Sequence, residues 1–324
     1  MAQPMVSVVI PIRNEEQFIA RCLEAVLGQD YPADRMEIIV ADGMSTDRTR
    51  EVIASLPDAE RITVIDNPGI VQATGLNLAI ERARGDVIVR VDGHTIIAPD
   101  YVRQCVSALA ETGADNVGGP MDPVGLTPMG RAIAAAGKSP FAVPTAFHVS
   151  QRPQYTDTVY LGAWPRRVFE TVGMFNPAVN INEDYELNYR IRQSGGRIYF
   201  TPRIHSRYFG RQTLRALARQ YFRYGKQKVR TLRLHPGSVR PRQLVAPLFV
   251  AGLVTGPLLG LVFPLAWSLW AAAVLLYAAL ALFFSWRAAQ RAGEPALFWR
   301  LPLVFLTIHL AWGSGFWAGL LLGQ

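Results

Sequence analysis

Short apolar runs alternate with amphipathic stretches through the first third of the chain. Runs rich in β-branched residues predict strands at residues 6–10, 37–41, 62–66 and 87–91. Apolar positions at helical spacing, with turn or capping residues before them, predict helices at residues 16–27, 45–56, 70–84 and 99–111. This alternation predicts an α/β fold, with a mostly parallel sheet covered by helices on both faces.

The next hundred residues have a less regular pattern. They predict strands at residues 159–162 and 197–200, and helices at residues 166–172 and 183–194. A long helix over residues 211–234 mixes arginine and lysine with leucine, tyrosine and phenylalanine. A solvated charged helix is one interpretation of that pattern. Its position just before an apolar region favours a helix lying in a membrane interface.

Three apolar segments dominate the last third of the chain, at residues 244–263, 265–286 and 301–322. Each is long enough to cross a bilayer core of about 30 Å as a helix. A buried helical subdomain is the alternative, but tryptophans near the segment ends favour a membrane. Arginines before the first segment and after the second predict that these flanks are cytoplasmic, on the inner membrane of a multi-pass protein. We therefore expect a cytosolic domain at 1–210, an interfacial region at 211–243 and three transmembrane helices at 244–324.

Charge and cysteine content narrow the class of protein. The formal net charge is +8, which fits either nucleic acid or an anionic membrane face. Because the arginines cluster beside the apolar segments, we expect the membrane and no nucleic acid. Cys22 and Cys105 fall in predicted helices and form no metal-binding pattern, so we interpret them as reduced core residues.

Polar residues follow several of the predicted strands. Residues 11–15, Asp42 and Asp92 all stand at the carboxyl ends of strands, where ligands bind in parallel sheets. Asp92 and His94 could face one divalent cation that bridges a diphosphate. Glu183 and Asp184 open a helix and could simply cap it, or supply a general base. The chain has neither of the glycine-rich phosphate motifs of dehydrogenases and P-loop proteins.

Taken in order, the segments VSVVIPIRNEE, IIVADGMSTD, VRVDGH and NEDYEL resemble the family 2 glycosyltransferases of GT-A fold, from residue 6 to about 224. The resemblance implies a nucleotide-sugar transferase with UDP as the expected nucleotide. It implies donor-binding roles for Pro11, Arg13, Asn14, Glu15, Asp42 and Asp92. It also implies Asp184, with Glu183 beside it, as the base. His94 stands where a second aspartate is usual, which leaves open whether the metal is Mn²⁺ or Mg²⁺.

Other residues resemble parts of the membrane-bound members of this family. His205 is similar to a late metal ligand, and Gly162, Ala163 and Trp164 lie where an acceptor pocket is lined. Gln220, Arg223 and Tyr224 resemble the Gln-x-x-Arg-Trp motif of synthases that hold an acceptor sugar. The overall order is most similar to succinoglycan-type enzymes, which implies inverting transfer to a polyprenyl-diphosphate-linked saccharide.

Three other functions remain open at this stage. A processive polysaccharide synthase and a polyprenyl-phosphate sugar synthase use the same catalytic motifs. A catalytically silent protein that keeps the shell of the fold is favoured only by His94.

Overall fold

The computed structural model describes residues 3–142, 145–179 and 181–322. The chain divides into two compact units, which we describe separately. One unit comprises residues 1–122 and 145–209, and the other comprises residues 123–144 and 210–324. Residues 123–144 therefore group with the C-terminal part of the chain.

The first unit is built on an eight-stranded sheet in the order β3-β2-β1-β4-β9-β6-β10-β8. Its strands are β1 (Val6–Ile12), β2 (Met36–Asp42), β3 (Ile62–Asp66), β4 (Val87–Arg90), β6 (Asn116–Gly119), β8 (Gln154–Tyr155), β9 (Tyr160–Pro165) and β10 (Ile198–Phe200). The four N-terminal strands are parallel, whereas β9 runs antiparallel to both β4 and β6. The sheet is thus mixed and mostly parallel, as the alternation of strands and helices predicts.

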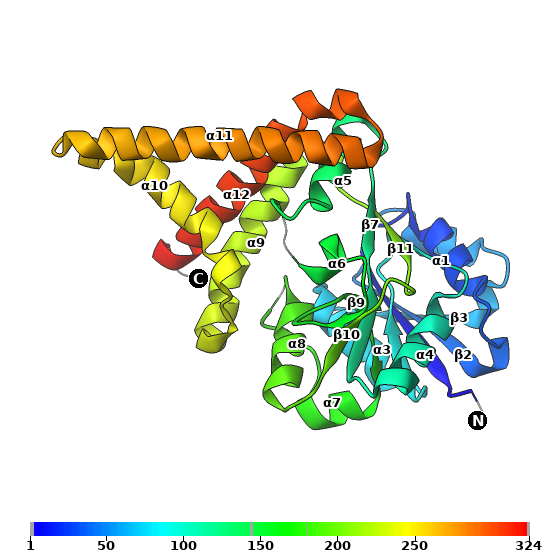
Figure 1. The fold of residues 1–324 in the computed structure, drawn as a ribbon. Helices are drawn as coiled ribbons and strands as arrows, with labels where there is room; N and C mark the ends of the chain where they lie inside the picture. Colours follow the sequence, from blue (N-terminus) through cyan, green and yellow to red (C-terminus); the bar gives the residue numbers. More distant parts are fainter. Residues whose placement is uncertain (1–2, 143–144, 180, 323–324) are drawn as a thin grey trace. The chain divides into compact units, whose positions relative to one another are not determined.

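Helices pack on both faces of this sheet (Figure 1). They are α1 (Ile19–Leu27), α2 (Thr49–Ala54), α3 (Gln72–Arg82), α4 (Tyr101–Thr112), α7 (Arg167–Val172) and α8 (Glu183–Gln193), with the short α6 (Ala146–Val149). The apolar stripes of α1 and α4 close one core against β1, β2 and β4, and this core holds both cysteines. Cys22 and Cys105 are free and buried, which confirms them as core residues.

A second sheet contains three strands that the apolar pattern does not predict. They are β5 (Thr95–Ile97), β7 (Met121–Val124) and β11 (Ser206–Phe209), in the order β5-β11-β7. β11 is antiparallel to β5, with Tyr208 opposite Thr95 and Ser206 opposite Ile97. Each strand is only three or four residues long. Periodicity cannot be read over so few positions.

The second unit is helical. It contains α5 (Pro128–Gly137), the basic helix α9 (Leu214–Leu234) and three long apolar helices. These are α10 (Val245–Gly260), α11 (Pro264–Ala292) and α12 (Leu301–Leu321), shown from yellow to red in Figure 1. All three apolar stretches are long and apolar enough to cross a membrane. α11 continues past the predicted end at residue 286. It includes Arg287 and Arg291 and ends before Gly293, which adopts the αL conformation.

Candidate active site

The carboxyl end of β1 lies at a switch point of the sheet in the first unit, and we call this switch-point edge the crevice. β1 pairs with β2 as far as Ile12 and Asp42, but its pairing with β4 stops at Val9 and Arg90. β2, the next strand in the sequence, lies on one side of β1, and β4 lies on the other. In open α/β sheets, this reversal of strand order is where ligands bind. The residues that the sequence places at strand ends all come to this edge.

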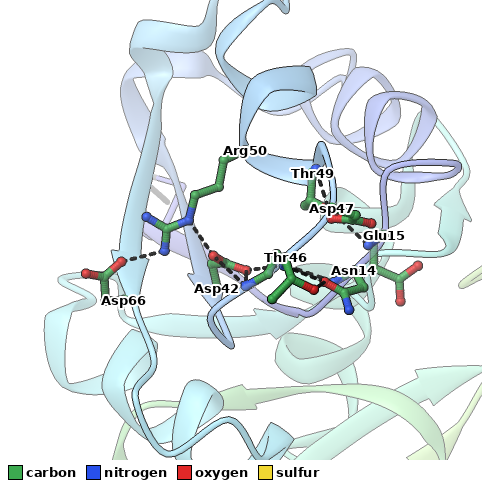
Figure 2. Close-up of polar contacts among 9 residues, drawn as sticks. Asn14, Glu15, Asp42, Thr46, Asp47, Thr49, Arg50 and Asp66 are labelled. Atoms are coloured by element: carbon green, nitrogen blue, oxygen red, sulfur yellow. Dashed lines mark hydrogen bonds and ion pairs between the residues drawn. The ribbon is translucent and has the colours of Figure 1, made fainter.

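The loop after β1 is fastened to the loop after β2 (Figure 2). The backbone N–H of Asn14 donates to Ser45 Oγ at 2.9 Å, and Asn14 Oδ1 accepts from the Thr46 N–H at 2.8 Å. The Glu15 N–H donates to Thr49 Oγ1 at 2.8 Å. Because Ser45 and Thr46 bond across to this loop, α2 begins at Thr49, four residues later than the capping residues predict.

Asp42, predicted to contact the donor, has a fully buried side chain. Its carboxylate accepts from Ser45 Oγ at 2.5 Å and from Arg50 Nε at 2.5 Å. Arg50 also donates to Asp66 Oδ1 (Figure 2), and 45 % of its side chain is exposed. At this corner the structure therefore presents a guanidinium held by two carboxylates. Sequence reasoning missed Arg50, although it lies in the first turn of the helix that follows Asp42.

Pro11 and Arg13 flank the end of β1 in different environments. Pro11 is buried within the strand opposite Ala41, so it shapes the end of the strand. Arg13 is exposed on the loop that follows. Of these two predicted donor residues, Arg13 is the one whose side chain solvent can reach.

Asp92 and His94 follow β4 on the other side of the crevice. The Asp92 carboxylate accepts from Arg90 Nε at 2.8 Å and from Gln72 Nε2 at 3.2 Å. His94 Nδ1 lies 2.8 Å from Glu15 Oε1, so a residue of the β1 loop orients the imidazole. A Cβ at Gly93 would lie 2.9 Å from Ile12 Cγ2, which explains glycine between the two polar residues. The segments after β1 and β4 therefore meet directly.

Arg90 links this segment to the start of α8. Its Nη1 lies 3.0 Å from Glu183 Oε1, and both side chains are only 5 % exposed. A single guanidinium thus contacts carboxylates from two sequence motifs that are far apart in the chain. Arg90 was also missed by sequence reasoning. Its signal is its position two residues before Asp92, because alternate residues of an extended segment face the same side.

Glu183 and Asp184 occupy different environments at the start of α8. Burial raises the pKa of Glu183 to about 7, although the nearby Arg90 acts in the opposite direction. Glu183 is enclosed and ion-paired with Arg90, and its predicted place beside the base stays a prediction. Asp184 is partly exposed, and burial also raises its pKa while Arg90 opposes the shift. Asp184 is therefore the carboxylate that a substrate could reach.

The donor set at Asp92 and His94 fits a divalent metal that is shared with a substrate diphosphate. Mg²⁺ sites in nucleotide enzymes use one or two protein ligands plus phosphate oxygens, and imidazole suits Mn²⁺. Glu15 fixes the His94 ring, as carboxylates beside metal-bound histidines do. Within residues 3–142, 145–179 and 181–322, no group of three or more His, Cys, Asp or Glu could hold a metal by itself. Any metal here would depend on ligands from the substrate.

His205 does not join this pair. The backbone oxygen of His205 accepts from the Ala98 N–H, whereas the ring of His94 packs against Tyr208 with centroids 5.3 Å apart. The β5–β11 register therefore places His205 and His94 at opposite ends of the strand pair, four residues or about 13 Å apart along the strand. Asp92 and His94 therefore lie together without His205, and their role as metal ligands stays a prediction.

The predicted acceptor segment on β9 is largely core. Trp164 is 1 % exposed and packs edge-on against Phe169 and Phe175. Ala163 is also fully buried, between β4 and β6. Gly162 adopts φ of 109°, and a Cβ there would lie 2.4 Å from the Trp164 ring. The Trp164 side chain therefore supports the sheet, which corrects its predicted role as an acceptor contact.

The second unit carries the other predicted acceptor residues on α9. Gln220 Nε2 donates to the Tyr224 hydroxyl at 2.7 Å, one helical turn away, and Arg223 lies between them in the sequence. A shallow, open groove of about 520 Å³ lies between α9 and α12 in the same unit. Arg219 is the one charged residue in its lining, which is otherwise made of apolar, small or hydroxyl side chains such as Phe222, Leu310 and Ser314.

The switch point of the sheet and the acids gathered there are typical of an α/β enzyme that binds its ligand at the carboxyl ends of the strands, and comparisons with known proteins identify the family. The family model for glycosyl transferase family 2 matches residues 7–133, and the model for glycosyl transferase family group 2 matches residues 87–286. The succinoglycan biosynthesis protein ExoA of Rhizobium meliloti (strain 1021) is 32 % identical, over 97 % of this chain and 94 % of the relative. The chain belongs to glycosyltransferase family 2 and is an enzyme of glycan biosynthesis.

Two more comparisons extend over nearly the whole chain. A dolichyl N-acetyl-α-D-glucosaminyl phosphate 3-β-D-2,3-diacetamido-2,3-dideoxy-β-D-glucuronosyltransferase of Methanococcus voltae is 25 % identical, over 98 % of each chain. The solved mannosyltransferase PcManGT of Pyrobaculum calidifontis, in complex with GDP-Man and Mn²⁺, has a TM-score of 0.63. That alignment covers 100 % of this chain and 89 % of the other at 21 % identity, so it supports the GT-A-like fold alone.

Proposed function

We propose that this glycosyltransferase moves a sugar from a nucleotide-sugar donor to a lipid-linked saccharide at the cytoplasmic face of the inner membrane, with inversion at the anomeric carbon. The observation that carries the proposal is the Arg90 bridge, because it holds Asp92 and the start of α8 beside one crevice. Asp92, assigned to the donor, and Asp184, assigned as the base, then lie on the same side of the sheet edge. The catalytic domain is cytosolic by the placement of arginines around the apolar helices.

The donor occupies the carboxyl edge of β1, β2 and β4 in this proposal. Asn14, Glu15 and Arg13 lie on the loop at this edge, and Arg50, held by Asp42, supplies exposed N–H donors for a nucleobase or ribose oxygen. We expect a UDP-sugar from the family resemblance. The solved archaeal mannosyltransferase, which is in complex with GDP-Man and Mn²⁺, supports a nucleotide donor and a divalent metal without selecting the base.

Asp184 removes the proton of the acceptor hydroxyl as its oxygen bonds to the anomeric carbon. The bond from that carbon to the nucleoside diphosphate breaks on the opposite side, which inverts the configuration. Arg90 acts on this step by keeping Asp184 ionised, because a nearby guanidinium opposes the rise in its pKa. Asp92 and His94 would hold a divalent cation, which when bound offsets charge on the departing diphosphate.

The acceptor is lipid-linked in this proposal. The groove of α9 and α12 is apolar with one arginine, a combination suited to a phosphate-bearing lipid. Gln220, Arg223 and Tyr224 lie on the same helix as that arginine and supply amide, guanidinium and aromatic groups for the attached sugar. The name of the archaeal relative, a transferase acting on a dolichyl-linked sugar phosphate, supports the same acceptor class.

A donor-depletion screen tests the proposal. The purified full-length protein is incubated with UDP- and GDP-sugars, Mn²⁺ or Mg²⁺, and a bacterial lipid extract, and the products are identified by mass spectrometry. We expect a lipid-linked saccharide longer by one sugar. A polymer ladder would instead indicate a processive synthase, and sugar on the lipid phosphate itself would indicate a polyprenyl-phosphate sugar synthase. If wild type and Asp184→Asn turn over every donor at the same rate, the assignment of the active site is wrong.

A further inference from the structure

Helix α12 packs along α9 in the same direction, over almost its whole length. A Cβ added at Gly315 would meet the Phe222 backbone oxygen at 2.0 Å, and one at Gly319 would meet that of Lys226 at 2.8 Å. The Gly315-x-x-x-Gly319 spacing lets the two backbones touch, as small residues do in membrane helix pairs. At the far end, Arg233 Nη2 lies 3.2 Å from the Gly319 backbone oxygen. The two helices therefore run parallel, with later residues of α12 beside later residues of α9.

This pairing is inconsistent with a simple crossing by α12. α9 carries basic residues from its first turn to its last: Arg215, Arg219, Arg223, Lys226, Lys228, Arg230 and Arg233. A helix that crossed the bilayer beside it would draw several of these into the hydrocarbon. Charged side chains at that depth are costly and rare. In the headgroup region, the same basic residues are favourable because the cytoplasmic leaflet is anionic.

The contacts of α12 with the apolar hairpin give an independent reason. The N-terminal half of α12 packs at the C-terminal end of α11, where Ala288 and Ala289 share a core with Leu301 and Val304. The C-terminal half instead reaches the first turn of α10, where Trp317 Nε1 donates to the Pro247 backbone oxygen at 2.8 Å. The two halves of α12 thus touch the two open ends of one hairpin (Figure 1).

Both open ends of that hairpin have basic flanks. Arg240 and Arg242 precede α10, Arg287 and Arg291 end α11, and no charged residue stands between positions 243 and 286. By the distribution of Lys and Arg, both ends lie on the cytoplasmic side and the turn at residues 261–263 points into or through the bilayer. A helix that joins the two open ends then has both of its own ends on the cytoplasmic side.

We propose that α12 lies with α9 in the cytoplasmic interface of the membrane, forming a two-helix platform on the lipid surface beside the inserted α10–α11 hairpin. The partner of this platform is the anionic lipid–water interface. The proposal differs from the three crossings that length and hydropathy predict, and it stands independently of the catalytic assignments. It also places the groove between α9 and α12 at headgroup depth, where a lipid phosphate lies.

Cysteine accessibility in the full-length protein distinguishes the two topologies. Leu322→Cys, just beyond the end of α12 and exposed, is treated with a membrane-impermeant maleimide in intact spheroplasts and again after permeabilisation. Arg291→Cys is the matched cytoplasmic control, and the parent protein gives the background from Cys22 and Cys105. We expect Leu322→Cys to react only after permeabilisation, as Arg291→Cys does. Reaction in intact spheroplasts would overturn the proposal.

A depth measurement keeps the proposal testable if accessibility is limited by the lipid. Bimane is attached at Leu303→Cys, Ala311→Cys and Leu320→Cys along α12, and at the exposed Leu269→Cys of α11, about two turns closer to the hairpin turn than Tyr277, which contacts His309 of α12. The labelled proteins are placed in nanodiscs containing nitroxide lipids of shallow or deep label. We expect strongest quenching of positions 303, 311 and 320 by the shallow label, and of position 269 by the deep label. Deep quenching of position 311 as strong as that of position 269 would show a crossing helix, because only the middle of a crossing helix lies deep.

Discussion

Asp42 and Asp92 follow two strands at the carboxyl edge of one sheet, and the arginines that hold them differ in exposure. Arg50 bridges Asp42 and Asp66 with 45 % of its side chain exposed, whereas Arg90 bridges Asp92 and Glu183 at 5 %. Water screens the pair of Arg50 with Asp66, where both side chains are exposed, and can reach the guanidinium beside the buried Asp42. A buried pair has lost the water that would replace a missing partner, so removing one member is costly. A ligand can therefore replace a contact of Arg50, whereas Arg90 belongs to the buried structure that supports the site.

We expect the largest effect on catalysis at Asp184, which lies beside the buried Arg90 bridge. Asp184→Asn should lower kcat by about 10²–10⁴-fold, because the amide cannot take up the proton of the acceptor hydroxyl. Donor affinity should change little, since Asp184 is assigned to the acceptor side. Single-turnover assays and donor binding measure the two quantities. The assignment fails if Asp184→Asn keeps the wild-type rate while Glu183→Gln loses it.

Removing the buried guanidinium should give the largest loss of stability. Arg90→Met leaves Asp92 and Glu183 facing each other without a cation, at a cost of about 3–5 kcal/mol. Thermal unfolding in detergent measures the change. Arg90→Lys, which keeps the charge, should recover part of it. Equal melting temperatures for wild type and Arg90→Met would remove the distinction between the two bridges.

The contact that joins the two sides of the crevice should affect metal dependence. Glu15→Gln weakens the carboxylate that orients His94, and such changes beside a ligand lower metal affinity by about 10–100-fold. We expect a higher Mn²⁺ concentration for half-maximal activity at an unchanged maximal rate. His205→Ala is the matched control and should leave the metal requirement as it is. A larger effect of His205→Ala would restore the ligand set predicted from the sequence.

The pH dependence of kcat should report on Arg90. A base must be deprotonated, so the rate rises with pH through the pKa of Asp184, which burial raises above the ordinary aspartate value and Arg90 lowers. Removing Arg90 therefore moves this rise to higher pH, and Arg90→Lys should leave it nearer the wild-type position. Rates at saturating donor over a pH series provide the test. A shift to lower pH would contradict the sign of this interaction.

The exposed bridge should give the smallest change in stability. Arg50→Ala removes a half-exposed guanidinium, and water and Ser45 can still solvate the buried Asp42 carboxylate, so the loss of stability should be smaller than that of Arg90→Met. If Arg50 contacts the donor, the same variant raises the KM for the nucleotide-sugar with kcat nearly constant. Asp66→Asn leaves Arg50 attached to Asp42 and serves as the control, with a smaller change in KM. A loss in Arg50→Ala as large as that in Arg90→Met would mean that this bridge belongs to the supporting structure as well.

The elements with strong periodicity could be predicted from the sequence. The four N-terminal strands, the helices between them and the three long apolar helices appear where the pattern places them, within a few residues. The carboxyl-edge position of Asp42 and Asp92 follows from parallel strands alone. In contrast, β5 and β11 are too short to carry a period, and no local pattern shows that residues 123–144 join the C-terminal unit.

The sequence by itself determined the fold class, the family motifs and the apolar helices, because each depends on residues close together in the chain. Only the tertiary structure decided which motif residues meet. The strand register separates His205 from His94, burial makes Trp164 a supporting residue, and Arg50 and Arg90 hold the carboxylates. These outcomes depend on solvent access and on contacts between distant segments, which a linear pattern does not contain.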